Sequence, residues 1–364
     1  MIRNIRVNIF AVTVVLICIG VIMIYSASSI YAADRYKDGF FFLKRHLSFL
    51  GIGTILTFLV MCIDYRSLQR YAKPLLIIAF ILLLLVLIPG IGREVLGARR
   101  WFRFKFLSFQ PSEFALLAVI VYVADFISRK EELIKSFIRG FVPPMMVLGG
   151  VAILILLQPD LGTTVSLAVV VIIMLFVARV RIAYVISMLL ASIPVLSVLI
   201  LSAPYRRARI LAFLNPWADP KGVGFQIIQS QIALGSGGFF GCGLGHSQQK
   251  LFYLPAAHTD FIFSIIGEEL GLVGTLAVIA LFMVFIHLGI KIIRNAPDRF
   301  GFFLSLGLLS MICFRVIVNI GVSCGLFPTK GLPLPFISYG GSSFIFDMVA
   351  VGILMNVART GDYP

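Results

Sequence analysis

The stretch "IFAVTVVLICIGVIMIYSA", residues 9–27, contains no charged side chain and is long enough to cross a bilayer as a helix. A second run of this kind, "LLIIAFILLLLVLIPGIG", occupies residues 75–92. Apolar residues make up 60% of the 364 residues and charged residues 13%. A soluble domain is about half apolar and about a quarter charged. The sequence therefore predicts an all-α polytopic membrane protein.

Similar runs along the chain predict about ten transmembrane helices. They are residues 7–28, 46–63, 74–90, 113–127, 141–157, 163–178, 183–202, 262–290, 300–320 and 342–357. An even number of spans places both termini on one side. The short, densely basic connections "SRKEELIKSFIR" (128–139) and "KIIRNAPDR" (291–299) indicate that this side is the cytoplasm.

Two long connections, 91–112 and 203–261, then face outward, the second one between helices 7 and 8. Connections of this length usually carry function. We expect them to form the active face of a single membrane domain over residues 1–364. Within the second, "GFQIIQSQIALG" (224–235) has the periodicity of a short amphipathic helix at the membrane interface.

Asp260 is the most informative polar residue, because it stands where the second loop enters an apolar span. His258 and Thr259 precede it. An Asp in this position can cap the helix through its first backbone N–H groups. It can equally act as a general base, partly desolvated yet open to a substrate. The residues alone leave both functions open.

Other ionisable residues fall within or beside predicted spans, where an unpaired charge is costly. Arg315 is the only Lys or Arg within a predicted span, and it is the expected partner of Glu268 and Glu269 in a structural ion pair. Asp347 is equally available to Arg315. Glu113 caps the fourth span or faces the outer cavity.

Basic residues interleaved with aromatic ones cluster in both outer loops: Arg93, Arg99, Arg100, Arg103 and Lys105, then Arg206, Arg207 and Arg209. Such residues can anchor loops at the interface. Guanidinium groups also match phosphate oxygens, and we favour a cradle for an anionic headgroup. The net charge of +15 accompanies no nucleic-acid recognition motif, so we expect no nucleic-acid partner. A lipid-linked phosphorylated substrate fits this pattern, and the residues alone leave enzyme and transporter open.

Several long motifs resemble the shape, elongation, division and sporulation (SEDS) family. They are "GARRW" (97–101), "FQPSEF" (109–114), "QPDLGT" (158–163), the stretch 215–271 that contains "AHTDFIF" (257–263), and "PTKGLPLPFISYGGSS" (328–343). The resemblance spans essentially all ten helices. It is to the division and sporulation branches rather than to the rod-elongation branch.

This resemblance implies a peptidoglycan glycosyltransferase that polymerises lipid II at the outer face of the bacterial cytoplasmic membrane. It also implies a class B penicillin-binding protein as partner, together with other division or sporulation proteins. The family's essential Asp corresponds to Asp260, which would act as the general base of one inverting displacement. Cations would stabilise the departing pyrophosphate, and the candidates are Arg99, Arg100, Arg206, Arg207 and Lys250. A divalent ion, Mg²⁺ or Mn²⁺, is a further candidate.

Glu113 and Glu268 are expected to hold the cavity in shape, although Glu113 and His258 are also candidates for substrate contact. Many family members carry a Lys three residues after this Glu, where this chain has Leu116. The role of Glu113 therefore depends on another partner. Two rival functions stay open: a lipid II flippase, and a non-catalytic scaffold for the penicillin-binding protein.

Overall fold

The computed structural model describes residues 2–95, 97–104, 107–251 and 254–360. Its helices are α1 (Ile2–Tyr36), α2 (Phe41–Cys62), α3 (Arg66–Arg70), α4 (Ala72–Leu87), α5 (Pro111–Arg129), the π-helix η1 (Phe137–Phe141), α6 (Val142–Leu157), α7 (Leu161–Val177), α8 (Ile182–Leu201), α9 (Pro204–Leu214), the 3₁₀ turn η2 (Pro216–Ala218), α10 (Phe225–Ser236), α11 (Ile262–Arg294), α12 (Arg299–Ser323) and α13 (Ser342–Thr360). Its strands are β1 (Arg93–Val95), β2 (Ala98–Phe104) and β3 (Leu107–Phe109).

Ten apolar helices in this part of the chain match the predicted spans one for one, so the predicted polytopic architecture is confirmed. Eight are long enough to cross a membrane by length and composition, and the shorter α4 and α7 complete the set. Helices α5, α12 and α13 form the centre, with 72%, 67% and 78% of their apolar windows buried. Helix α8 is peripheral, with 6% buried.

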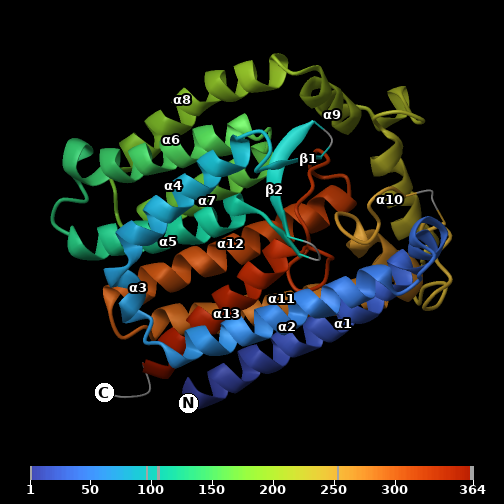
Figure 1. Cartoon of the computed structure of the whole chain (residues 1–364), viewed down its shortest axis with the longest axis horizontal. Coiled ribbons are helices and arrows are strands. Elements are labelled where there is room, and N and C mark those ends of the chain that lie inside the picture. Colours follow the sequence, from blue (N-terminus) through green and yellow to red (C-terminus); the bar gives the residue numbers. More distant parts are fainter. Residues whose placement is uncertain (1, 96, 105–106, 252–253, 361–364) are drawn as a thin grey trace.

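The start of α1 and the end of α13 lie at the same end of the bundle (Figure 1). Helices α9 and α10 lie toward the opposite end, which we call the cavity end because the pocket described below opens there.

The connection 91–112 contains a three-stranded antiparallel sheet, which the all-α prediction missed. Arg93 pairs with Trp101 across β1 and β2, and Phe102 pairs with Phe109 across β2 and β3. Gly97, at φ 75°, makes the first turn possible. The hydroxyl of Ser342 ties β3 to the start of α13, since it donates to the Ser108 carbonyl at 2.8 Å.

The connection 203–261 contains α10, as predicted, and also α9, which was not predicted. Helix α10 buries Ile227, Ser230 and Ala233. The Ser230 hydroxyl lies 2.6 Å from that of Ser264 on α11 and donates to the Ser323 carbonyl at 2.8 Å. The helical spacing of Phe225, Ile228 and Ile232 in the sequence predicts that these three form its apolar face, but Ile232 is 43% exposed. Ile228, on the predicted apolar face, is 4% exposed, so the helix packs on α11 and α12 through part of that face together with the adjacent Ile227 and Ser230.

The connection between α12 and α13 dips back into the bundle. Leu334, Phe336 and Ile337 are each at most 1% exposed. A Cβ atom added at Gly20, in the middle of α1, would lie 2.6 Å from the Phe336 carbonyl oxygen. Only glycine permits this approach, which fixes the dipping loop against α1.

Candidate active site

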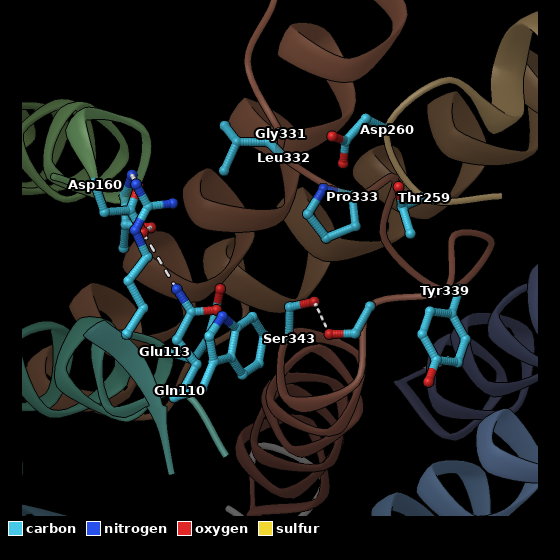
Figure 2. Close-up of a pocket in the computed structure, with 14 residues that line it drawn as sticks. Gln110, Glu113, Asp160, Thr259, Asp260, Gly331, Leu332, Pro333, Tyr339 and Ser343 are labelled. Atoms are coloured by element: carbon cyan, nitrogen blue, oxygen red, sulfur yellow. Dashed lines mark hydrogen bonds between the residues drawn. The ribbon is translucent and has the colours of Figure 1, made fainter. Parts of the chain in front are cut away.

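A cavity of about 230 Å³ opens among β2, α5, α7 and the start of α13 (Figure 2). The connection before α11 and the connection after α12 complete its lining. Its lining is largely polar. The lining residues are Arg100, Trp101, Gln110, Glu113, Asp160, Thr163, Thr259, Asp260, Gly331, Leu332, Pro333, Tyr339, Gly340 and Ser343. Three residues predicted from the sequence, Asp260, Arg100 and Glu113, therefore meet at one cavity.

Asp260 does not cap α11. The cap residue of this helix is Phe261, and no side chain accepts a hydrogen bond from its first turn. The Asp260 carboxylate instead lies beside Gly331, where an added Cβ atom would come within 2.9 Å of Oδ2. Within the described residues, no Lys or Arg forms an ion pair with it. Of the two functions that the sequence left open, the geometry contradicts capping.

Asn319 on α12 holds the two loops at Asp260 together. Its Nδ2 donates to the Asp260 carbonyl at 3.0 Å and to the Leu332 carbonyl at 2.8 Å. The backbone N–H of Tyr339 donates to the His258 carbonyl at 3.0 Å. The carboxylate is thus carried by a loop that is fixed on both sides.

Burial raises the pKa of the Asp260 carboxyl to about 6, although the charge of Arg209 and the hydroxyl of Thr259 act to lower it. A carboxylate base gains proton affinity when its pKa approaches the working pH. Asp260 is thus mostly ionised at neutral pH and a stronger base than an exposed Asp.

Glu113 lies in the first turn of α5 and meets Arg315 and Asp347 in a buried cluster. Arg315, 1% exposed, forms an ion pair with Glu113 through Nη2 and a 2.9 Å contact to Asp347 through Nη1. The predicted pairing of Arg315 with Asp347 is confirmed. The partner that Glu113 needs in the absence of a Lys at position 116 is Arg315.

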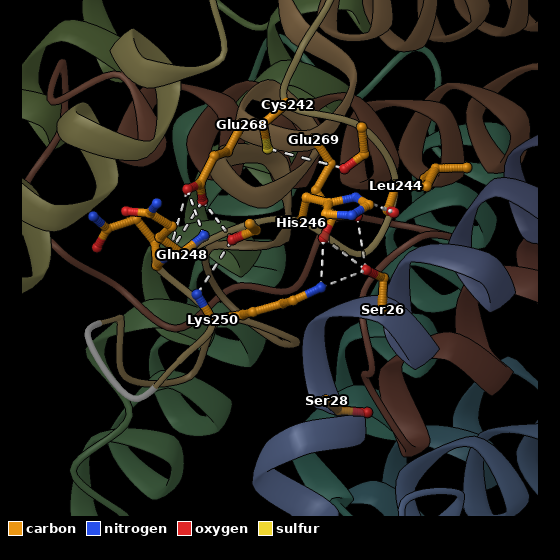
Figure 3. Close-up of polar contacts among 12 residues, drawn as sticks. Ser26, Ser28, Cys242, Leu244, His246, Gln248, Lys250, Glu268 and Glu269 are labelled. Carbon is orange, nitrogen blue, oxygen red and sulfur yellow. Dashed lines mark hydrogen bonds and ion pairs between the residues drawn. The ribbon is translucent and has the colours of Figure 1, made fainter.

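Glu268 and Glu269 have other partners, so their predicted pairing with Arg315 is wrong (Figure 3). Glu269 accepts from Lys250 Nζ at 2.9 Å and from the Ser26 hydroxyl at 2.7 Å. Glu268 accepts from the Ser247 hydroxyl and from the Gln248 backbone N–H. Lys250 is buried in this cluster and does not line the cavity that holds Asp260.

The predicted arginines separate into two groups. Arg100 lines the cavity and donates to the carbonyls of Gln158 and Pro159 at 2.7 and 2.6 Å, which fixes the turn before α7. Arg99 pairs with Glu94 on the small sheet at 3.1 Å. Arg206 and Arg207 lie on α9 and do not line the cavity; Arg206 donates to the Leu199 carbonyl and Arg207 is exposed.

His258 packs among aromatic side chains and is not part of the cavity lining. Its ring centroid lies 4.4 Å from that of Phe42 and 5.9 Å from that of Tyr339. Burial lowers the pKa of His258 to about 4, so the ring is neutral at pH 7. These contacts pack the His258 ring against α2, which carries Phe42, and against the connection that carries Tyr339.

Sequence reasoning did not single out several cavity residues, namely Gln110, Thr163, Tyr339 and Ser343. It also passed over Lys330, which precedes Gly331. Lys330 Cε lies 2.8 Å from where a Cβ atom at Gly162 would be, close to Asp160. Burial lowers the pKa of Lys330 to about 8, and Asp160 opposes this shift, so the ammonium is mostly protonated at neutral pH. Lys330 is the only charged residue between positions 316 and 346, and this isolation is the feature of the sequence that could have singled it out.

Among the described residues, no three His, Cys, Asp or Glu side chains group closely enough to hold a metal ion by themselves. Asp160 accepts from the Thr163 backbone N–H at 3.1 Å, and Glu113 is paired with Arg315. Asp160 and Glu113 thus both have partners within the chain.

Residues 6–363 match the family model for cell cycle proteins that covers FtsW, RodA and SpoVE. The chain is 49% identical over 352 residues to stage V sporulation protein E of Bacillus subtilis (strain 168), covering 97% of this chain and 96% of that protein. It is 48% identical over 350 residues to the probable peptidoglycan glycosyltransferase FtsW of Geobacter metallireducens, covering 96% and 93%.

Two solved structures have the same fold over 98% of this chain. One is a chain from a study of how a peptidoglycan synthase complex coordinates polymerization and crosslinking, with a TM-score of 0.79, 31% identity and 98% of that chain covered. The other is the rod shape determining protein RodA of Thermus thermophilus, with a TM-score of 0.73, 28% identity and 97% of that chain covered.

Proposed function

The chain belongs to the FtsW/RodA/SpoVE family of cell cycle proteins, and we propose that it is a peptidoglycan glycosyltransferase that polymerises lipid II. The observation that carries this proposal is the Asp260 carboxylate, which lines a polar cavity and neither caps a helix nor forms an ion pair among the described residues. We place the cavity at the outer face of the bacterial cytoplasmic membrane, with both termini in the cytoplasm.

In the proposed reaction, Asp260 takes the proton of the 4-hydroxyl of the acceptor sugar. The oxygen attacks the anomeric carbon of the donor, and the bond from that carbon to the pyrophosphate breaks. The donor linkage is α and the new bond is β, so one inverting displacement suffices. Hydrolytic glycosidases need a second carboxylic acid to protonate the leaving oxygen. A pyrophosphate leaves as a stable anion, so this reaction needs cations in that place.

Arg100 and Lys330 are our candidates for this role. Arg100 lines the cavity, and Lys330 lies beside Asp160 and Gly162 at the start of α7. Positive groups fixed near developing negative charge stabilise a transition state. We assign the pyrophosphate to this side of the cavity and the acceptor hydroxyl to the side of Asp260.

We also propose that the chain works with a class B penicillin-binding protein, which crosslinks the new strand, and with other division or sporulation proteins. The support is the likeness to a chain from a peptidoglycan synthase complex that couples polymerization to crosslinking. The 48–49% identities to FtsW and SpoVE proteins support both the division and the sporulation setting.

The direct test is strand formation from labelled lipid II by the purified chain with its penicillin-binding partner, whose transpeptidase is blocked by a β-lactam. We expect glycan strands that the partner alone does not make. Movement of lipid II across vesicle bilayers without strands would establish a flippase instead. Intact partner binding with neither activity would establish a scaffold.

The pH dependence of this reaction should report Asp260. The carboxylate acts as a base only when ionised, so kcat/KM is expected to fall about tenfold per pH unit below pH 6. Arg209→Gln removes a charge that lowers this pKa, so the midpoint should move to higher pH. Arg207→Gln, on the same helix, is the control. A rate without an acidic limb between pH 5 and 7 would contradict the role of Asp260.

Gly331→Ala should disturb the site without unfolding the protein. The added methyl carbon would lie 2.9 Å from Oδ2 and 3.4 Å from Cγ of Asp260, so the carboxylate has to turn away. A displacement of about 1 Å at a reacting group can lower a rate about 100-fold. Gly149→Ala is the control, because no atom lies within 4 Å of its added Cβ. Equal rates of strand formation in both variants would show that the carboxylate position does not matter.

A further inference from the structure

The segment between Lys221 and Lys250 contains no charged residue, although it belongs to a connection outside the spans. After α10 it continues as "GGFFGCGLG", residues 237–245, which we call the aromatic tip. Phe239, Phe240 and Leu244 are 71%, 84% and 53% exposed there. Three large apolar side chains this exposed within one nine-residue segment are costly in water.

The aromatic tip is seated on a break in α11. Gly271 leaves the helical conformation there, with φ 66° and ψ −162°. An added Cβ atom at Gly237 would lie 1.9 Å from the Gly267 carbonyl oxygen, and one at Gly241 would lie 2.2 Å from the Glu269 carbonyl oxygen. The glycines therefore allow the backbone of the tip to lie directly against the backbone of α11.

Hydrogen bonds across this contact satisfy the backbone groups that the break leaves unpaired. The backbone N–H groups of Cys242 and Gly243 donate to the carbonyls of Glu268 and Glu269 at 2.9 and 3.0 Å. Figure 3 labels Cys242, Glu268 and Glu269. In return, Leu272 donates to the Gly238 carbonyl at 2.9 Å and Val273 to that of Phe239 at 3.2 Å. Irregular backbone is tolerated at membrane depth only when its polar groups are satisfied within the protein, as they are here.

The position of the tip along α11 also fits the height of a membrane boundary. Leu272 stands about 33 Å along the helix from Arg294, at 1.5 Å per residue. A bilayer has a hydrocarbon core about 30 Å thick. Beyond the break, Leu272, Val273 and Leu276 are 45–54% exposed, as lipid-facing residues of a span are. Since the Val273 backbone N–H donates to the Phe239 carbonyl, the aromatic tip lies next to this exposed apolar surface.

We propose that the aromatic tip is a membrane-inserted element, with Phe239, Phe240 and Leu244 in the acyl chains of the leaflet at the cavity end. The charge-free sequence, the satisfied backbone, the height and the continuity with α11 each fit this occupant. The loop that leads from the tip to Asp260 is bound to the carboxylates beside the break. Its Ser247 binds Glu268, and its Lys250 binds Glu269. The tip thus fixes that loop relative to the lipid.

The test uses tryptophan fluorescence of the full chain in phosphatidylcholine bilayers, with and without bromine on the acyl chains. Phe240→Trp adds one indole at the tip to the two native Trp residues. We expect its extra emission, relative to wild type, to be quenched by brominated lipid and unaffected by aqueous iodide. Leu276→Trp, on the lipid-facing surface of α11, is the positive control. Lys221→Trp, at the charged start of the segment, is the aqueous control.

Two results would overturn the proposal. Quenching by iodide and not by brominated lipid, as at Lys221→Trp, would place the tip in water. Protection from both reagents would show that protein, such as a second copy, covers it. The readout does not depend on catalysis, so it separates this proposal from that of the enzymatic function.

Discussion

Asp260→Asn is expected to lower the rate of strand formation by about 10²- to 10⁴-fold, the usual contribution of a positioned base. The amide has nearly the shape of the carboxylate but cannot take a proton. The Asp260 side chain makes no ion pair within the described residues, and its carbonyl, bound by Asn319, is unchanged by the substitution. The fold should therefore survive, and the loss should lie in kcat.

Asp219→Asn is the matched control for this experiment. Asp219 is an exposed carboxylate in the same connection and accepts from the Gly222 backbone N–H at 3.0 Å, an interaction that an Asn oxygen preserves. We expect wild-type rates from this variant. A similar loss in both variants would point to a general effect of charge in this connection and would contradict the assignment to Asp260.

Arg315→Met is expected to cost about 3–5 kcal/mol of stability, because removing one partner of a buried ion pair leaves its counter-charges uncompensated. Glu113 and Asp347 are both buried and both contact this guanidinium. Denaturant titration in a mild detergent measures the loss. An unchanged midpoint would show that the two carboxylates do not depend on Arg315 for their charge balance.

Two companion variants separate charge from shape. Glu113→Gln/Asp347→Asn in the Arg315→Met background removes all three charges and should recover much of the stability, as neutral replacements of buried ion pairs often do. Leu116→Lys in the same background puts a cation one turn from Glu113 on α5, where Leu116 is fully buried. It should restore stability in part, and Ala115→Lys, at an equally buried position two residues from Glu113 that does not face it, should not.

The spans could be predicted from sequence because each is a local property. A run such as 75–92 is apolar over its whole length, so no tertiary information is needed to recognise it. The sheet in 91–112 was not predicted, because β1 and β3 are only three residues long and cannot show an alternation of apolar and polar residues. The break in α11 was not predicted from the sequence, because the residues on both sides of Gly271, Leu270 and Leu272, are apolar like the rest of the span.

The site was predicted in part for the same reason. Asp260 and Arg100 stand out locally, as charges at the edge of apolar or aromatic segments. The partner of Glu113 depends on how α5 and α12 are rotated against each other, which no short window of sequence records. Lys250 was assigned to the substrate, but the fold turns it toward Glu269.

The central claim is that Asp260 acts on the bound substrate as a base. The most direct measurement takes one sample of Asp260→Asn, folded and bound to its partner, and determines both its affinity for lipid II and its rate of strand formation. Affinity close to that of wild type with the rate lost is the result we predict. Affinity weakened by the same factor as the rate would make Asp260 a binding residue and contradict the proposed mechanism.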